Sequence, residues 1–179
     1  MPMPILLRLV ILCPHDPSES HPMSMVSLTV NGQSVERDVP DNTLLAFFLR
    51  EELGLTGTHV GCDTSQCGCC VVRLDGVSVK SCTTLVHQIQ DAQVQTVESL
   101  AQGEQLHPIQ QAFTECHALQ CGYCTPGMMM SALDLIEHHD EVLTPEVVRA
   151  EMEGNLCRCT GYHNIVNAVV QASRVMKGG

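Results

Sequence analysis

Several residue types that support common functions are scarce in this chain. It has no tryptophan among its 179 residues, and aromatic residues make up only 3%. Lysine and arginine total 9 against 20 aspartates and glutamates, which gives a formal net charge of -11 at pH 7. Nucleic-acid binding needs basic grooves and aromatic stacking platforms, so this composition argues against a DNA- or RNA-binding function. A hydrophobic content of 44% still suffices for a packed aliphatic core.

A long hydrophobic run is also missing. The run ILLRLVILC at 5–13 is too short to span a bilayer and contains Arg8, so no transmembrane helix is predicted. Residues 1–24 lack the basic stretch and small-residue cleavage site of a secretory signal, and they contain no twin-arginine pair. We therefore interpret residues 1–24 as a disordered extension and expect a cytoplasmic protein. In that compartment persistent disulfides are rare, so the eleven cysteines are expected to bind metal or to stay free.

The segment from 25 to 97 has the pattern of a small sheet domain. Apolar and polar residues alternate on both sides of Asn31-Gly32 and of Asp75-Gly76, which predicts two β-hairpins. The stretch QVQTV predicts a further short strand near residue 95. Between the hairpins, residues 41–54 predict a short amphipathic helix. Its candidate N-caps are Asp41, Asn42 and Thr43.

The rest of the chain predicts helices instead. Four stretches read as helical, and two of them open with Thr-Pro, which is typical of an N-cap followed by proline at the first helical position. These pairs are Thr125-Pro126 and Thr144-Pro145, and the predicted helices are 108–117, 126–139, 145–152 and 163–176. Four helices fit a small bundle over residues 108–177, and the polar segment 98–107 is the expected linker. We therefore expect an α+β chain of two domains.

Four cysteines of the first domain match the spacing of a [2Fe-2S] loop. Cys62, Cys67 and Cys70 form C-x4-C-x2-C, the plant-type pattern, and Cys82 follows at the end of the next hairpin. Two irons bridged by two sulfides need four converging thiolates, so a wrapping loop supplies three and a neighbouring strand supplies the fourth. Glycines in this loop let the backbone adopt positive φ and bring N–H donors close to the anionic cluster. These glycines are Gly57, Gly61 and Gly68.

The second domain carries its thiols as the pairs CGYC and CRC. Cys121 and Cys124 lie between the first two predicted helices, and Cys157 and Cys159 lie between the last two. Each pair precedes a helix N-terminus, where free amides and the helix dipole favour an anion. The two pairs look like halves of one site, so we predict a second [2Fe-2S] cluster there.

One of the cysteines in the first loop is surplus to these two sets. Cys69 could in principle replace Cys70 as a ligand. The predicted strand begins at Val71, and the x2 spacing from Cys67 fits Cys70, so we take Cys70 as the ligand. Free buried thiols behave as small hydrophobic groups and need no function. The thiols outside both sets are Cys13, Cys69 and Cys116.

Two other kinds of metal centre fit this spacing less well. Zinc accepts C-x2-C with C-x-C, but its sites usually come as two knuckle pairs in one small fold, and C-x4-C-x2-C is poor zinc spacing. A Rieske centre needs two histidines in place of cysteines on one iron. The histidines of this chain do not interleave with the cysteines in that way and are expected at the surface or at helix ends. Those considered are His59, His87, His117 and His163.

In their order and separations, four segments resemble the iron-sulfur small subunits of molybdenum hydroxylases, the xanthine oxidase and aldehyde oxidase family. The segments are GCDTSQCGCC, SVKSC, LQCGYCTPGMMM and GNLCRCTGYHNIV, and the likeness runs from about residue 26 to residue 176. Within the family, GCDTS and LDGVSVKSC are most similar to small subunits of the carbon monoxide dehydrogenase type. Cys69 departs from the family pattern, which has alanine or a similar small residue there, and the leader of 24 residues is longer than expected.

This resemblance implies a fold and a division of labour between subunits. It implies an N-terminal β-grasp, ferredoxin-like domain with an outer cluster, then a four-helix-bundle domain with an inner cluster. Gln120 and Cys159 would lie against a molybdopterin, in its cytosine dinucleotide form, on a large subunit, and the outer cluster would face FAD on a medium subunit. Electrons would pass from molybdenum through the inner and outer clusters to FAD, in a dimer of heterotrimers. The implied outer ligands are Cys62, Cys67, Cys70 and Cys82, and the inner ones are Cys121, Cys124, Cys157 and Cys159.

The chain has no motif for activating a substrate. It contains no G-x-G-x-x-G, no P-loop and no acid/base constellation beside the thiols, so no residue is predicted to be catalytic. We therefore predict the non-catalytic electron-transfer subunit of a molybdenum-containing oxidoreductase. Two alternatives are a free-standing two-cluster electron carrier and a zinc-stabilised interaction module. A visible spectrum distinguishes the colourless zinc module, and co-purification with molybdenum and flavin subunits distinguishes the free carrier.

Overall fold

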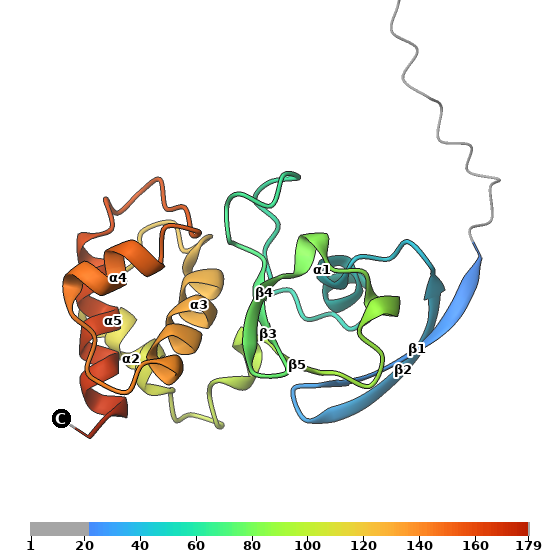
Figure 1. The fold of residues 1–179 in the computed structure, drawn as a ribbon, viewed down its shortest axis with the longest axis horizontal. Helices are drawn as coiled ribbons and strands as arrows, with labels where there is room; N and C mark the ends of the chain where they lie inside the picture. The colour runs from blue at the N-terminus through green and yellow to red at the C-terminus, as the bar shows by residue number, and fades with distance from the viewer. Residues whose placement is uncertain (1–21, 179) are drawn as a thin grey trace, which may run out of the picture.

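The computed structural model describes residues 22–178, which form a sheet half and a helical half (Figure 1). A five-stranded sheet occupies one end of the molecule, and four helices occupy the other, so the predicted mixed α+β class is confirmed. Residues 1–21, which hold most of the predicted extension and Cys13, lie outside the described residues. Within the described part, no helix has the length and apolar character needed to cross a membrane.

Both predicted hairpins are confirmed, and each has a two-residue turn. Strands β1 (Met23–Val30) and β2 (Gln33–Pro40) pair antiparallel around Asn31-Gly32, whose φ angles are 51° and 80°. Strands β3 (Val71–Leu74) and β4 (Val77–Lys80) pair around Asp75-Gly76, with φ of 49° and 85°. Positive φ at both turn residues matches the twist of the strands, and this explains the Asn-Gly and Asp-Gly sequences. Strand β1 begins at Met23, inside the segment assigned to the extension.

The third predicted strand joins the two hairpins into one sheet. Strand β5 (Gln93–Gln95) lies parallel to β1 and antiparallel to β3, which gives the order β2-β1-β5-β3-β4. The short helix α1 (Leu45–Phe47) continues as a π-helical turn (Phe48–Glu52), and Phe48 is fully buried in the apolar core of this half. The predicted N-caps are wrong: Leu44 precedes the first helical residue, has extended backbone and makes no side-chain capping bond.

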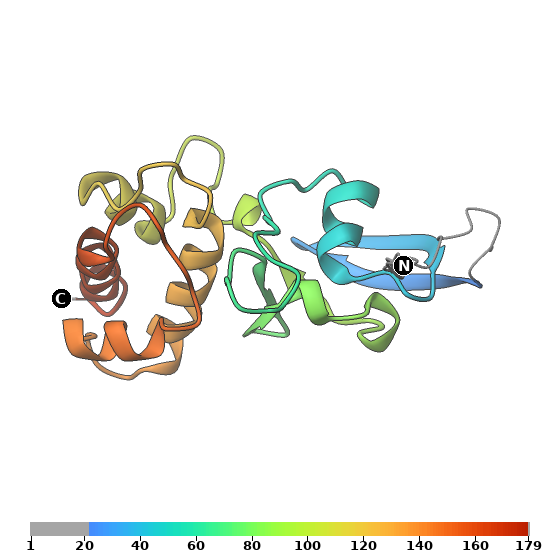
Figure 2. The same cartoon turned by 90° about the horizontal axis from the view of Figure 1, so that it is seen from above.

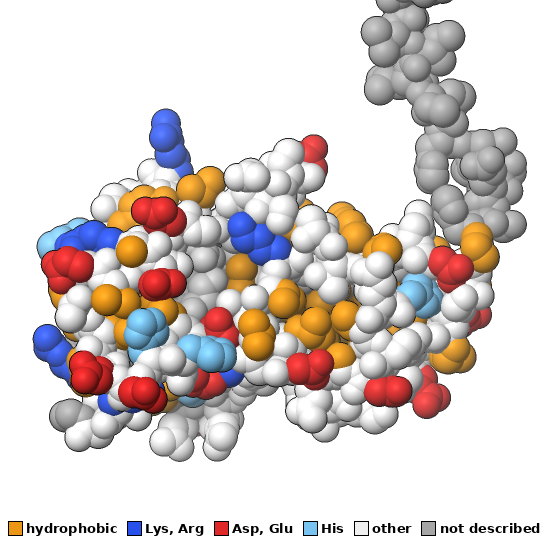
Figure 3. Space-filling view, viewed as in Figure 1, with side chains coloured by type: hydrophobic (Ala, Val, Ile, Leu, Met, Phe, Trp, Pro, Cys, Tyr) orange, Lys and Arg blue, Asp and Glu red, His pale blue; other side chains and the backbone are white. Residues whose placement is uncertain are grey.

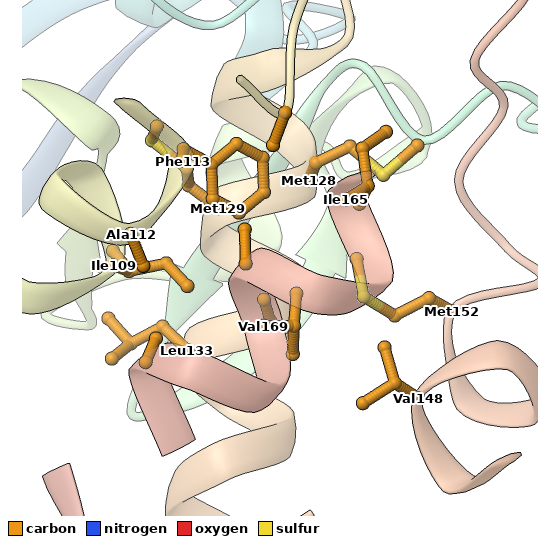
Figure 4. Close-up of a cluster of buried hydrophobic side chains, with 14 of the residues drawn as sticks. Ile109, Ala112, Phe113, Met128, Met129, Leu133, Val148, Met152, Ile165 and Val169 are labelled. Atoms are coloured by element: carbon orange, nitrogen blue, oxygen red, sulfur yellow. The ribbon is translucent and has the colours of Figure 1, made fainter. Parts of the chain in front are cut away.

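The four predicted helices are confirmed to within two residues at their ends, and they share one apolar core (Figure 4). Phe113, Val148 and Val169 come from three different helices and are fully buried. The methionine run at 128–130 is also buried, so these side chains fill core space. Each fully buried apolar side chain contributes about 1.5–3 kcal/mol relative to exposure. The helices are α2 (Pro108–Glu115), α3 (Thr125–His138), α4 (Pro145–Glu151) and α5 (His163–Met176).

Side chains satisfy the free N–H groups at the start of two helices. At α2, the His107 ring accepts a hydrogen bond from the N–H of Ile109 at 3.3 Å, and Gln110 Oε1 accepts one from the N–H of His107 at 2.9 Å. At α4, the Thr144 hydroxyl accepts one from the N–H of Val147 at 3.4 Å, as the Thr-Pro sequence predicts. Such caps remove unsatisfied donors and typically contribute ~1 kcal/mol each.

The other Thr-Pro pair does not act as a cap. Cys124 occupies the N-cap position of α3, and Thr125 is already the first helical residue. The N–H of Thr125 donates to the carbonyl of Gly122 at 3.1 Å, so the turn of the CGYC loop continues directly into the helix. Cys124 has helical backbone angles, whereas a capping threonine needs the extended backbone that places its oxygen over the next N–H groups. The prediction of Thr125 as an N-cap is therefore wrong.

Helix α3 joins the two halves. It lies alongside β3 and β4 in both orthogonal views (Figures 1 and 2). Arg73 on β3 is largely buried and forms an ion pair with Glu137 on α3. Asp134 on α3 accepts hydrogen bonds from the N–H and the hydroxyl of Ser78 on β4, at 3.1 and 2.9 Å. On the face in Figure 3, hydrophobic side chains gather across the middle of the molecule and acidic side chains lie on both halves.

Candidate metal centres

The first cysteine loop runs from the end of the π-helical turn to β3 and arranges its thiols in two pairs. Cys62 Sγ accepts a hydrogen bond from the N–H of Cys67 at 3.4 Å. At the entrance of β3, the carbonyl of Cys70 accepts from the N–H of Ser81 at 3.3 Å and from its hydroxyl at 2.7 Å, which holds Cys82 beside Cys70. The four predicted outer ligands are thus brought together as Cys62 with Cys67 and Cys70 with Cys82.

The two outer pairs differ in how readily their thiols ionise. The N–H groups of Cys67 and Thr64 stabilise the Cys62 thiolate and lower its pKa to about 6. Burial, together with a hydrogen bond to Cys70, raises the pKa of Cys82 to about 11. Iron binds thiolates, so Cys62 is held close to its ligand form, whereas Cys82 must release a proton when metal binds.

The three loop glycines have different surroundings. A Cβ at Gly61 would stand 3.1 Å from Cys69 Sγ and 3.2 Å from Cys67 Sγ. Gly68 has φ of +71°, a conformation that other residues rarely adopt. Gly57 is different, because its N–H donates to Glu98 Oε1 at 2.8 Å. The expectation that Gly57 directs its N–H at the cluster is therefore wrong. The expectation of positive φ is also wrong for Gly57 and Gly61, because Gly68 alone among the three has it.

The second set of cysteines also forms two pairs. Cys121 Sγ and Cys159 Sγ lie 3.4 Å apart. Cys124 is the hydrogen-bond partner of Cys157, and burial followed by this contact raises the pKa of Cys124 to about 12. Each pair takes one thiol from CGYC and one from CRC, although these segments are separated by α3 and α4. The structure therefore brings all four predicted inner ligands together.

Local hydrogen bonds orient the inner thiols. The N–H of Tyr123 points at Cys121 and lowers the pKa of that thiol. Cys157 Sγ lies 3.2 Å from the Thr160 hydroxyl, and the N–H of Cys157 donates to the Tyr162 hydroxyl at 2.9 Å. Helix α3 starts directly after Cys124, so its N-terminal dipole acts on this site. Helix α5 starts four residues after Cys159, so the dipole at its N-terminus acts on the site less directly.

The donor set and one buried hydroxyl test whether a [2Fe-2S] cluster fits. Each iron of such a cluster takes two thiolates, and each site offers two pairs of thiols. The hydroxyl of Thr125, next to Cys124, is buried and has no hydrogen-bond partner among residues 22–178. A cluster sulfur would accept this hydrogen bond. The residues therefore fit the group. In the same range, no three His, Cys, Asp or Glu side chains converge as a site for a single metal ion.

Two cysteines of the described part stand outside these pairs. Cys69 is buried beside Cys67, and burial raises its pKa to about 12. Cys70 rather than Cys69 is the partner of Cys82, which favours Cys70 as the ligand. Cys116 lies in the helical half at the end of α2, where its thiol donates to Gln171 Oε1 at 3.1 Å.

The histidines considered for a Rieske centre have other surroundings. The ring of His59 stacks on Tyr123. His87 Nε2 lies 3.3 Å from the carbonyl of Pro40. His117 has a left-handed φ of 51° just beyond α2, and His163 is the first residue of α5.

The inner site reaches the surface, and Gln120 lies beside it. Gln120, Cys121 and Cys159 are all exposed, whereas none of the four outer thiols is exposed. Large exposed apolar side chains lie close in sequence to the inner thiols and were not predicted as functional from the sequence. The signal that could have found them is an apolar residue within three positions of each thiol in a loop that should otherwise be polar. They are Leu119, Tyr123, Leu156 and Tyr162.

Two family models match the chain, one for each half. The model described as "2Fe-2S iron-sulfur cluster binding domain" matches residues 28–101. The model described as "[2Fe-2S] binding domain" matches residues 96–170. The matches meet in the segment predicted as the linker, so each predicted set of four cysteines falls within its own model.

Characterised relatives match nearly along their whole length. Caffeine dehydrogenase subunit gamma from Pseudomonas sp. (strain CBB1) is 49% identical over 152 residues, covering 83% of this chain and 90% of the relative. The nicotine 6-hydroxylase small subunit from Paenarthrobacter nicotinovorans is 44% identical over 147 residues, covering 82% and 88%. A chain in the crystal structure of quinoline 2-oxidoreductase from Pseudomonas putida 86 superposes with a TM-score of 0.82 at 40% identity, covering 87% and 98%.

Proposed function

Because the chain belongs to the family of iron-sulfur small subunits of molybdenum hydroxylases, we propose that it is the electron-transfer subunit of such an oxidoreductase. The carrying observation is the arrangement of eight cysteines as two sites of two thiol pairs each, one site in each half. Substrate activation belongs to other subunits, and this chain holds the redox centres between them.

We assign four cysteines to each cluster. When bound, a [2Fe-2S] cluster accepts and releases one electron. The protein's part is to supply thiolates, to direct N–H donors at the sulfur atoms and to keep water from the buried pairs. The outer ligands are Cys62, Cys67, Cys70 and Cys82, and the inner ligands are Cys121, Cys124, Cys157 and Cys159.

The difference in exposure supports an order of the two sites along the electron path. The inner site, with Cys159 and Gln120 at the surface, is proposed to face the molybdopterin of a large subunit, in its cytosine dinucleotide form. The outer site is proposed to pass electrons to FAD on a medium subunit. The exposed apolar residues that lie within three positions of the inner thiols support docking of a partner there, since such groups are enriched in interface cores. A dimer of heterotrimers in the cytoplasm completes the proposal.

The fold is proposed to follow the same division. The sheet order β2-β1-β5-β3-β4, with α1 and Phe48 packed into its core, supports a β-grasp domain over residues 25–97. The shared core of α2 to α5 supports a four-helix bundle over residues 108–177. Residues 98–107 are the proposed linker, although Leu100 within it is buried in the helical core.

The test is to purify the protein from its native host without disrupting its complexes. We expect a brown sample that contains iron and acid-labile sulfide for two clusters and that co-purifies with a molybdenum subunit and a flavin subunit. A stable brown monomer would instead support a free electron carrier. A colourless zinc-containing sample would contradict the electron-transfer function altogether.

A further inference from the structure

The two cysteine loops touch each other through bare backbone. A Cβ at Gly127, in the first turn of α3, would lie 2.2 Å from the carbonyl oxygen of Gly68. A Cβ at Gly68 would lie 2.5 Å from the carbonyl oxygen of Gly154 and 2.6 Å from Asn155 Nδ2. Neither position has room for a side chain, so the loop before β3 is in direct contact with both segments that carry the inner thiols.

Two hydrogen bonds cross this contact on the CRC side. Asn155 is 6% exposed, and its Nδ2 donates to the carbonyl of Gly68 at 3.1 Å. The N–H of Leu156 donates to the carbonyl of Cys67 at 2.9 Å. Because Leu156 directly precedes Cys157, one hydrogen bond and the backbone of one residue connect Cys67 of the outer set to Cys157 of the inner set.

A second link crosses on the CGYC side. The Tyr123 hydroxyl donates to the carbonyl of Val60 at 2.9 Å. Its ring stacks on His59, with ring centroids 4.5 Å apart and an interplanar angle of 17°. His59 Nδ1 in turn lies 2.7 Å from the carbonyl of Tyr123. Tyr123 stands between Cys121 and Cys124, and His59 and Val60 shortly precede Cys62.

On the basis of the proposed function, we propose that these contacts form one joint, in which Asn155 and Tyr123 are the positioning residues for electron transfer between the two clusters. Electron tunnelling falls exponentially with distance, so a small separation of the loops slows transfer strongly. The joint fixes the distance between the loops, because both the CGYC and the CRC segment contribute contacts to it. The Cys67 carbonyl and the Leu156 N–H give the electron a bonded path with one hydrogen bond.

The test compares Asn155→Leu with wild type in the purified complex. Iron content and the paramagnetic resonance signal of each reduced cluster are measured first. The dipolar splitting between the two reduced clusters and the rate of electron transfer between them follow. We expect Asn155→Leu to keep the wild-type iron content and individual signals, but to show altered splitting and slower transfer.

Ser78→Ala is the matched control. It removes the hydrogen bond from the Ser78 hydroxyl to Asp134, elsewhere in the same interface, and keeps the backbone N–H bond, so it should lower the unfolding temperature slightly and leave the splitting unchanged. Wild-type splitting and rate in Asn155→Leu would overturn the proposal. If Asn155→Leu fails to load iron, Tyr123→Phe is the second test, because it removes only the hydroxyl hydrogen bond to Val60. Unchanged splitting in Tyr123→Phe would then contradict the joint. A wild-type complex without iron contradicts the proposed function, and the joint with it.

Discussion

The outer and inner cysteine sites use the same number of thiols but enclose them differently. In the outer site, one loop wraps three thiols and β4 leads to the fourth, and none of the four is exposed. In the inner site, Cys124 and Cys157 lie inward while Cys121 and Cys159 are exposed. The chain thus encloses the outer site more fully, whereas two of the four inner thiols are open to the surface. On the proposed route, this difference would let electrons enter at the exposed inner thiols.

The strongest test of this comparison removes one ligand from each site in turn. We expect Cys121→Ser to lose the inner cluster and Cys82→Ser to lose the outer one, each keeping the other cluster's iron, because serine is a poor ligand for this soft site. Both variants should lose turnover with the natural acceptor completely. Substrate should still reduce molybdenum in both, as seen in the paramagnetic resonance signal of Mo(V). Full turnover in Cys82→Ser would contradict the proposed route.

A second test asks whether the two sites are in fixed contact. We expect Gly127→Ala to destabilise the protein by about 1–3 kcal/mol, since the new methyl group would overlap the Gly68 carbonyl oxygen and force the backbone apart. Chemical denaturation measures the change. Gly154→Ala is the matched control, because the nearest atom to its Cβ is Lys80 Nζ at 3.9 Å. Equal stability of both variants would show that the halves separate easily at this point.

A third test sharpens the ligand choice in the outer site. Cys69→Ala should keep both clusters and lower the unfolding free energy by only about 1 kcal/mol, because it deletes one buried sulfur atom beside Cys67. Iron and sulfide analysis measures the cluster content. Cys70→Ala, the neighbouring control, should lose the outer cluster. The reverse outcome would make Cys69 the ligand.

The smallest effect concerns His107, which caps α2 and belongs to neither thiol set. Burial lowers the pKa of His107 from the usual value of 6.5, and the charge of Glu137 opposes this shift only in part. The neutral ring caps α2, so its contribution to stability is present above pH 6.5 and is lost as the pH falls through the lowered pKa. Thermal unfolding between pH 7 and pH 5 measures this loss.

The variant His107→Asn keeps a good N-cap but does not titrate in this range. We expect its unfolding temperature to fall less than that of wild type over the same interval. Parallel pH profiles for the two proteins would show that protonation of His107 does not weaken the cap.

Local sequence signals predicted most of the secondary structure because the deciding interactions are local. Asn31-Gly32 and Asp75-Gly76 adopt the positive φ that their residue types favour, and Thr144 makes its capping bond within one turn. Thr125 shows the limit of such signals, since the same Thr-Pro pair fails as a cap where a cysteine turn runs straight into the helix.

Spacing likewise placed the eight cysteines in two sets, but it did not give the pairing within each set. The pairing of Cys121 with Cys159 and the contacts of Tyr123 and Asn155 join segments far apart in sequence. A periodic pattern carries no information about such contacts. The residues of the joint therefore became visible only from the fold.

The glycines at positions 68 and 127 limit which homologues can exchange halves with this protein. A chimera that took its sheet half from one homologue and its helical half from another would keep this contact only if the first parent had glycine at position 68 and the second had glycine at 127 and an amide at 155. Although each half matches its own family model, the halves are therefore exchangeable only between parents that preserve both sides of this contact.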